Sequence, residues 1–208
     1  MRPAELDAVT IDAYGTLVGL ANPVPALTAG LSALGVERDA AAVERAFAKE
    51  VAYYRERSHE GRDDATLHAL RRECVAVILD DLGSDLNPAA FVDGFASALR
   101  FELLPGAREA VERLRRLGLE LAVVSNWDIA LREHLTAVGL DGLTVVTSAE
   151  AGAPKPDPAV FLQALERLGV RPERAMHVGD SEADEEGAHA AGMHFAPAPL
   201  DRAVEALA

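Results

Sequence analysis

From about residue 105 to residue 197 the chain alternates short, β-branched apolar runs with stretches of helical periodicity, separated by turn residues. The apolar runs lie at 119–125, 143–148 and 175–181. Helical spacing follows them or lies between them, at 107–117, 127–140, 158–168 and 183–191. Strands that alternate with helices pair in parallel, and the helices cover both faces of the sheet. The sequence therefore predicts an α/β fold with a doubly wound, Rossmann-like parallel sheet.

A first strand is predicted at 8–12 (AVTID), the other run that suits a buried strand. Between it and residue 105 we find no convincing strand. This region is rich in Ala, Glu and Arg, and its spacing predicts helices at 24–34, 40–57, 64–82 and 88–100. We therefore expect an α/β core made of residues 1–18 and 100–208, interrupted just after its first strand by an all-helical domain at 19–99.

Polar and charged residues follow the predicted strands at their carboxyl ends. They are Asp12 after the first strand, Ser125 and Asn126 after the second, Lys155 in the loop APKPDP after the third, and Asp180 after the fourth. Right-handed crossovers bring these strand ends to one edge of the sheet, where ligands bind in such folds. Side chains that are far apart in the sequence are thus expected to meet at one site.

These residue types suit a hydrolase. An aspartate at a strand end can attack an electrophile and form a covalent intermediate, which water then cleaves. Ser125 can donate a hydrogen bond to the transferring group, and Lys155 can neutralise charge on that group and on Asp12. Asp12 and Asp180 supply the two hard oxygen ligands that Mg²⁺ typically takes from protein. Asp184 lies near Asp180 if this segment is already helical.

Four segments of the chain resemble, in the right order, the four motifs of the haloacid dehalogenase (HAD) superfamily: DAYGTL (12–17), VVSNWD (123–128), PKPDP (154–158) and HVGDSEADEEGAHAAG (177–192). The resemblance implies that Asp12 is the nucleophile, that the helical insertion is a cap, and that Asp184 supports Lys155 or a metal-bound water. Asn126 and the backbone amides of Ala13 and Tyr14 are candidate donors to the substrate. The backbone carbonyl of Tyr14 is a candidate metal ligand.

The first motif departs from the phosphatase pattern of the family at Tyr14. Phosphatases carry a second aspartate at this position, which serves as general acid and base. The 2-haloacid dehalogenases of the family instead show DAYGT, because halide leaves without a proton and without a metal. Gly179, Asp180 and Asp184, however, match the fourth motif of the magnesium-dependent enzymes, which those dehalogenases lack.

Three functions stay open. The first is a Mg²⁺-dependent phosphatase for a small phosphorylated metabolite, the second a metal-independent 2-haloacid dehalogenase, and the third a HAD-like binding or regulatory protein with little turnover. Asp180 and Asp184 favour the first, Tyr14 favours the second, and the missing acid-base residue permits the third. We rank them in this order.

Charge and cysteine content limit the partners. The net charge of -14 repels phosphate backbones, so nucleic acid is not expected, and a small anionic substrate must be attracted by local cations. The single cysteine, Cys74, permits no intrachain disulfide. No run resembles a signal peptide or approaches the roughly 20 apolar residues of a membrane span. We expect a cytoplasmic monomer or homodimer without a membrane partner.

Two smaller expectations concern the last third of the chain. His177 lies within the predicted strand at 175–181 and is interpreted as a satisfied core residue rather than a catalyst. Asp157 is expected to be the N-cap of a helix whose first residue is Pro158.

Overall fold

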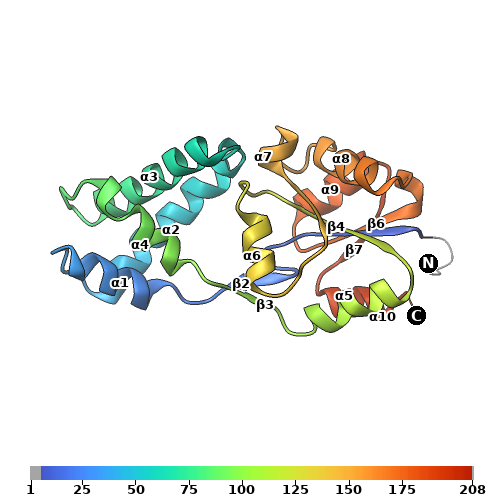
Figure 1. Ribbon diagram of the computed structural model, residues 1–208, viewed down its shortest axis with the longest axis horizontal. Coiled ribbons are helices and arrows are strands. Elements are labelled where there is room, and N and C mark those ends of the chain that lie inside the picture. Colours follow the sequence, from blue (N-terminus) through green and yellow to red (C-terminus); the bar gives the residue numbers. More distant parts are fainter. Residues whose placement is uncertain (1–5, 208) are drawn as a thin grey trace. The chain divides into compact units, whose positions relative to one another are not determined.

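A computed structural model describes residues 6–207, and the chain divides into two compact units (Figure 1). One unit is formed by the chain up to Gly19 together with the chain from Phe101 onward, and we term it the α/β unit. The other is Leu20–Arg100, which we term the helical unit. Each unit has its own buried apolar cluster, as expected for separate folding units.

The α/β unit contains a five-stranded sheet in the order β5-β4-β1-β6-β7, and every neighbouring pair is parallel. The strands are β1 (Ala8–Ile11), β4 (Glu120–Ser125), β5 (Thr144–Thr147), β6 (Ala175–Gly179) and β7 (His194–Pro197). The strand β1 is thus the central strand of the sheet, and its burial on both faces explains its largely apolar sequence. The predicted α/β fold with a parallel sheet is confirmed.

The register of β1 aligns the strand ends that matter for function. Ile11 is opposite Val123 of β4 on one side and opposite Val178 of β6 on the other. The backbone amide of Asp12 extends this ladder by donating to the carbonyl of Val178 at 2.8 Å. The residues that follow β1, β4 and β6 therefore leave the sheet at the same edge.

Helices cover both faces of this sheet. In Figure 1, α8 (Ala159–Leu168) and α9 (Glu182–Ala190) lie on one side of the sheet, and α5 (Ala107–Arg116) and α10 (Leu200–Glu205) lie on the other. The first side is closed by a cluster of small and aromatic residues that includes Ala8, Ala122, Val124, Phe161, Ala164 and Ala188. The short helices α6 (Leu131–Ala137) and α7 (Ser148–Ala151) complete the unit.

Two helix starts differ from the prediction. The helix expected from residue 127 begins only at Leu131, because the backbone of Trp127 is bonded to Ser148 and Ala149 instead of to its own helix. The helix expected from Pro158 begins at Ala159, with Pro158 at the N-cap position. Asp157 therefore precedes the N-cap by one residue, but it still accepts a hydrogen bond from the amide of Ala159, the first residue of the helix, at 2.8 Å.

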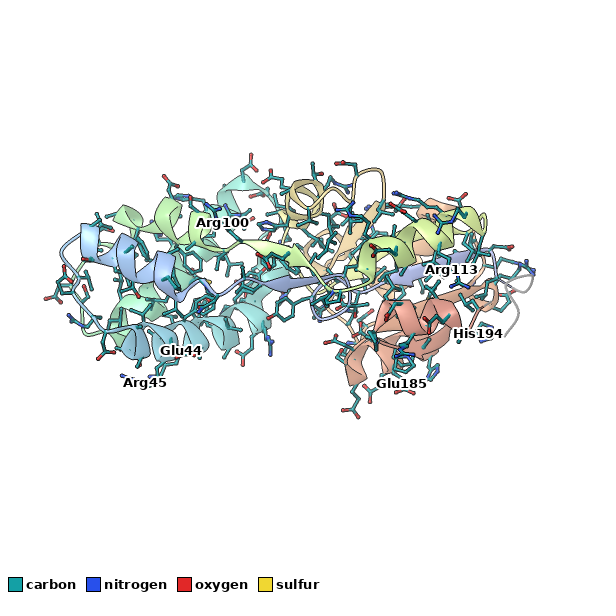
Figure 2. The ribbon with its side chains drawn as sticks, turned by 90° about the horizontal axis from the view of Figure 1, so that it is seen from below. Glu44, Arg45, Arg100, Arg113, Glu185 and His194 are labelled. Atoms are coloured by element: carbon teal, nitrogen blue, oxygen red, sulfur yellow. The ribbon has the colours of Figure 1, made fainter. Side chains whose placement is uncertain are left out.

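The helical unit consists of α1 (Val24–Ala33), α2 (Ala40–Arg57), α3 (Asp64–Asp81) and α4 (Val92–Ala98), with 3₁₀ turns at Ser58–Glu60 and Pro88–Ala90. Its core includes Leu27, Leu31, Val43, Ile78, Phe91 and Phe95. One carboxyl group, that of Glu50 on α2, lies inside this unit at 4% exposure, and burial raises its pKa to about 7. The thiol of Cys74 on α3 is its hydrogen-bond partner. Glu44 and Arg45, by contrast, project outward from α2 (Figure 2).

Two three-residue strands were missed by the prediction that no strand lies between the first strand and residue 105. They are β2 (Val18–Leu20) and β3 (Phe101–Leu103), and they pair with each other where the chain leaves and re-enters the α/β unit. Hydrogen bonds extend the pairing at both ends, from Leu104 to Leu17 at 2.9 Å and from Ala21 to Arg100 at 2.8 Å. Three residues are too few to show the period-two pattern that reveals a strand.

Candidate active site

Asp12 lies just after β1 and is almost fully buried. Its Oδ1 atom accepts hydrogen bonds from Ser125 Oγ at 2.9 Å and from Lys155 Nζ at 2.5 Å. Ser125 ends β4, and Lys155 lies in the loop that follows α7. The structure therefore brings together three residues that are predicted to be catalytic, from three separate segments of the chain.

The ammonium group of Lys155 is buried between two carboxylates. Besides Asp12 it donates to Asp184 Oδ1 and to the carbonyl of Val124, the latter at 3.3 Å. Burial by itself lowers the pKa of Lys155, but the negative charges of Asp12 and Asp184 outweigh it and raise this pKa above its usual value. The lysine is therefore a fixed positive charge at the carboxyl edge of the sheet.

Asp184 is held by the helix in which it lies. Ser181 is the N-cap of α9, and its side chain accepts from the amide of Asp184, while Asp184 Oδ2 accepts from the amide of Ser181 at 3.1 Å and from its hydroxyl. This capping box fixes the carboxylate beside Lys155. Burial opposes ionisation, yet the hydrogen bond from His177 and the charge of Lys155 hold the pKa of Asp184 well below its usual value. Burial lowers the pKa of His177, which favours the neutral form of its ring.

Two glycines make room for the carboxylates. A Cβ atom at Gly179 would lie 2.4 Å from Cγ of Asp184, and a Cβ atom at Gly15 would lie 2.1 Å from Oδ2 of Asp180. Gly15 also has a φ of +87°, which favours glycine on its own. The site thus depends on close approach of side chains to the backbone at both positions.

Asp180 is the exposed member of an acidic cluster. Among the residues that the structure describes, Asp12, Asp180 and Asp184 each offer a carboxylate oxygen within 4.8 Å of the others. Burial and the charges of Asp12 and Asp184 raise the pKa of Asp180. A divalent cation would relieve this repulsion, and carboxylate oxygens are the ligands that Mg²⁺ prefers, so the donor set fits the metal.

The remaining predicted site residues lie around this centre. Ala13 is buried, and its carbonyl accepts from the amides of Leu17 and Val18, which closes the loop after Asp12. The side chain of Tyr14 is 44% exposed. Asn126, a candidate donor to the substrate, donates one amide hydrogen to the carbonyl of Lys155 at 3.1 Å and accepts from the amide of Lys155 at 2.7 Å. It therefore anchors the lysine loop, a contact that spacing in the sequence does not reveal.

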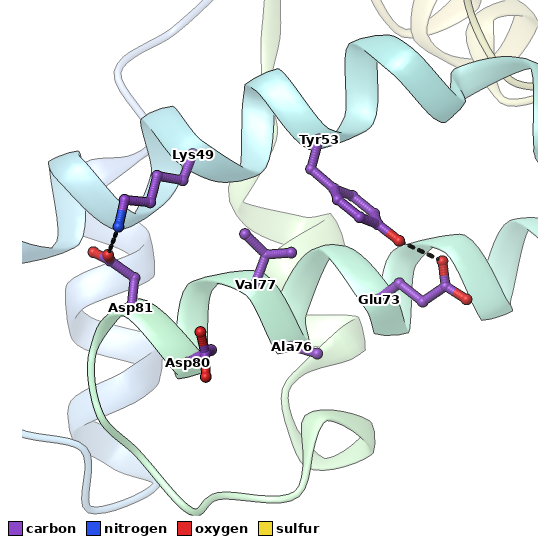
Figure 3. A pocket seen from close by; sticks show the side chains of 7 residues that line it. All are labelled: Lys49, Tyr53, Glu73, Ala76, Val77, Asp80 and Asp81. Carbon is purple, nitrogen blue, oxygen red and sulfur yellow. Dashed lines mark hydrogen bonds and ion pairs between the residues drawn. The ribbon is translucent and has the colours of Figure 1, made fainter.

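A separate recess is formed entirely by residues of the helical unit. It lies between α2 and α3, has a volume of about 390 Å³, and is lined by Lys49, Tyr53, Glu73, Ala76, Val77, Asp80 and Asp81 (Figure 3). Lys49 is paired with Asp81, and the hydroxyl of Tyr53 donates to Glu73 at 2.8 Å. Four of its polar groups are thus paired with one another, and we assign no reaction to it.

A parallel sheet with an aspartate, a serine and a lysine joined at its carboxyl edge is an arrangement suited to nucleophilic catalysis. The family model of the haloacid dehalogenase-like hydrolases matches residues 6–192. The chain therefore belongs to this family, as the four motifs predict.

In the part of the chain that the structure describes, we find no helix with the length and apolar character of a membrane span.

Two known proteins illustrate the sequence similarity. It is 36% identical to haloacid dehalogenase-like hydrolase domain-containing protein 3 of Mus musculus, over 96% of this chain and 86% of the mouse protein. It is 40% identical to glyceraldehyde 3-phosphate phosphatase of Methanopyrus kandleri, over 56% of this chain and 54% of that protein.

Among solved structures, the defluorinating L-2-haloacid dehalogenase Rha0230 has the same fold, with a TM-score of 0.78, 20% identity and coverage of 100% and 98% of the two chains. The L-2-haloacid dehalogenase of Xanthobacter autotrophicus, with chloropropionic acid covalently bound, has a TM-score of 0.68 and 26% identity over 92% of this chain and 77% of its own.

Proposed function

We propose that this hydrolase is a Mg²⁺-dependent phosphatase that acts on a small phosphorylated metabolite. The observation that carries the proposal is the acidic cluster of Asp12, Asp180 and Asp184, with a divalent cation as its natural occupant. The likeness to an archaeal phosphatase supports the same class of substrate. A small anionic substrate also agrees with the buried positive charge of Lys155, because the chain as a whole is strongly acidic.

In the proposed reaction Asp12 is the nucleophile. Ser125 and Lys155 both bond to Oδ1, so we assign the attack on phosphorus to Oδ2. The bond between phosphorus and the leaving oxygen breaks, and its electron pair departs with the leaving group. Water then attacks the phosphorus of the aspartyl phosphate, which releases inorganic phosphate and restores Asp12. Ser125 and Lys155 stabilise the negative charge on the transferring group in both steps.

A bound Mg²⁺ ion would supply neutralisation of the phosphoryl oxygens. Asp12, Asp180 and the backbone carbonyl of Tyr14 would hold it, while Asp184 supports Lys155. The amides of Ala13 and Tyr14 and the remaining N–H of Asn126 are the proposed donors to the substrate. We assign the choice of substrate to the helical unit, which is inserted where the family places its cap.

Tyr14 supports a second candidate, a metal-independent 2-haloacid dehalogenase. Halide leaves without a proton, so a dehalogenase has no need of the aspartate that Tyr14 replaces. The likeness to a solved dehalogenase with a covalently bound substrate favours this candidate. Asp180 counts against it, because the dehalogenase reaction gives this carboxylate no role.

The deciding experiment measures phosphate release from p-nitrophenyl phosphate and halide release from 2-chloropropionate, each with Mg²⁺ and with EDTA. We expect phosphate release that requires Mg²⁺ and is lost in Asp12→Asn, because an amide is a very poor nucleophile. Halide release that persists in EDTA would establish the dehalogenase instead. Turnover of neither substrate by a folded protein would favour the third possibility, a binding or regulatory protein.

A further inference from the structure

His177 lies in β6 and is completely buried, with both of its ring nitrogens hydrogen-bonded. Nδ1 is 2.8 Å from Thr10 Oγ1, and Nε2 is 3.0 Å from Asp184 Oδ1. Thr10 and His177 are opposite each other in the pairing of β1 with β6. The ring of Phe161 packs nearly perpendicular to the imidazole, with 4.9 Å between the two ring centroids. The imidazole thus joins the middle of the sheet to the site.

The tautomer of this imidazole follows from its partners. Both oxygens of Asp184 already accept hydrogen bonds, Oδ1 from Lys155 and Oδ2 from the amide and hydroxyl of Ser181, so in its contact with Oδ1 the Nε2 atom of His177 is the donor and carries the ring proton. Nδ1 is then an acceptor, and the hydroxyl of Thr10 donates to it. Thr10 therefore selects the tautomer that Asp184 requires, in the manner of the outer partners that orient metal-bound or catalytic histidines.

Asp184 is the group through which this arrangement reaches the reaction. Its Oδ1 accepts from both His177 and Lys155, while Oδ2 is occupied by Ser181. The ammonium of Lys155 is in turn shared between Asp184 and Asp12. A shift of the Asp184 carboxylate would therefore move Lys155 relative to the nucleophile, and misplacement by about 1 Å can cost about 100-fold in rate.

We propose that His177, oriented by Thr10, is a positioning residue that holds the Asp184 carboxylate in place so that Lys155 stays on Asp12. The proposal rests on the proposed function only in giving Asp12 and Lys155 their roles, which are the same for phosphate esters and for haloacids. It extends the site from the sheet edge into the interior of the α/β unit.

Two amide substitutions separate positioning from packing. Glutamine at position 177 can place its amide nitrogen where Nε2 lies, whereas asparagine can place it only near Nδ1. We expect His177→Gln to keep kcat within about threefold of wild type and His177→Asn to lower kcat by about 10- to 100-fold, the usual range for partners that orient a site. We expect KM to change by less than about twofold in both variants, because the side chain at position 177 does not touch the substrate.

A matched pair at Thr10 gives an independent measurement. Thr10→Val keeps the shape but removes the donor to Nδ1, whereas Thr10→Ser keeps the hydroxyl. We expect Thr10→Val to lower kcat and Thr10→Ser to keep kcat close to that of wild type. Thermal unfolding is recorded for both variants. Equal kcat for the two amide variants, or losses that simply follow the unfolding temperature, would overturn the proposal. If the His177 variants fail to fold, equal kcat values for Thr10→Val and Thr10→Ser would also overturn the proposal.

The assay uses whichever of p-nitrophenyl phosphate and 2-chloropropionate the wild-type protein turns over, so failure of the phosphatase proposal leaves this test intact. If neither is turned over, ¹⁵N NMR of histidine-labelled protein decides. A proton on Nε2 of His177 that moves or exchanges between nitrogens in Thr10→Val supports the proposal. A proton on Nδ1 in the wild-type protein contradicts it.

Discussion

Glu50 provides a test of the energetics of the helical unit. Its carboxyl group is 4% exposed and lies within an apolar core, with the thiol of Cys74 as a partner. The substitution Glu50→Gln keeps the size and the hydrogen-bonding capacity of the side chain but cannot ionise. We therefore expect the variant to be more stable than wild type at neutral pH, because it avoids the cost of burying a charge.

The magnitude follows from the pKa, which burial raises from 4.5 to about 7. Between these two values the folded protein keeps a proton that the unfolded chain has released, so the free energy of unfolding falls as the pH rises through this window. At about 1.4 kcal/mol for each pKa unit, the full loss is about 3 kcal/mol. Most of it develops between pH 5 and pH 8, so the advantage of Glu50→Gln should grow by about 2 to 3 kcal/mol over this range.

The assay is urea unfolding at pH 5, 6, 7 and 8, followed by far-UV circular dichroism. Trp127 is the single tryptophan of the chain and lies in the α/β unit, so its fluorescence follows that unit and separates it from the helical unit. Glu44→Gln on the exposed side of α2 is the matched control and should change stability by less than about 0.5 kcal/mol at every pH. A difference between Glu50→Gln and wild type that does not vary with pH would refute the reasoning.

Three further predictions concern the site. Asp180→Ala should weaken Mg²⁺ binding by at least about tenfold in calorimetry, and an unchanged affinity would place the metal elsewhere. Tyr14→Asp should raise the rate on alkyl phosphates by at least about tenfold, because a phenol with an ordinary pKa near 10 is a poor acid-base group at neutral pH. If this variant is slower than wild type on alkyl phosphates, another residue supplies the proton. Gly179→Ala should cost about 1 to 3 kcal/mol of stability and most of the activity, since its Cβ would displace Asp184; normal kcat would show that the carboxylate can move without harm.

Much of the sheet could be predicted because its inner strands are buried on both faces and are therefore largely apolar in sequence. This is the case for β1, β4 and β6, which carry Asp12, Ser125 and the loop of Asp180. The rule that parallel strands end at one edge then brings these residues together without further information. The strands β2, β3 and β7 were not predicted. They consist of three or four partly exposed residues, which are too few to show the alternation of apolar and polar residues that identifies a strand.

The contacts that refine the site could not be read from the sequence. His177 was interpreted as a satisfied core residue, and the structure does place it in the core with both nitrogens bonded. Its link to Asp184 joins a strand to the first turn of a helix, and no helical or strand period relates these two positions. The same holds for Asn126, whose two bonds to Lys155 depend on the path of a loop.

The central place of β1 has a consequence for biosynthesis. A ribosome makes this strand before the other four strands of the sheet, yet its partners lie around residues 123 and 178. Leu20–Arg100 is continuous and can form its helices as soon as it emerges. The nascent chain can therefore contain the folded helical unit while the strand AVTI still lacks both of its partners. Until then both edges of this strand are unpaired, and an unpaired strand edge can pair with another chain.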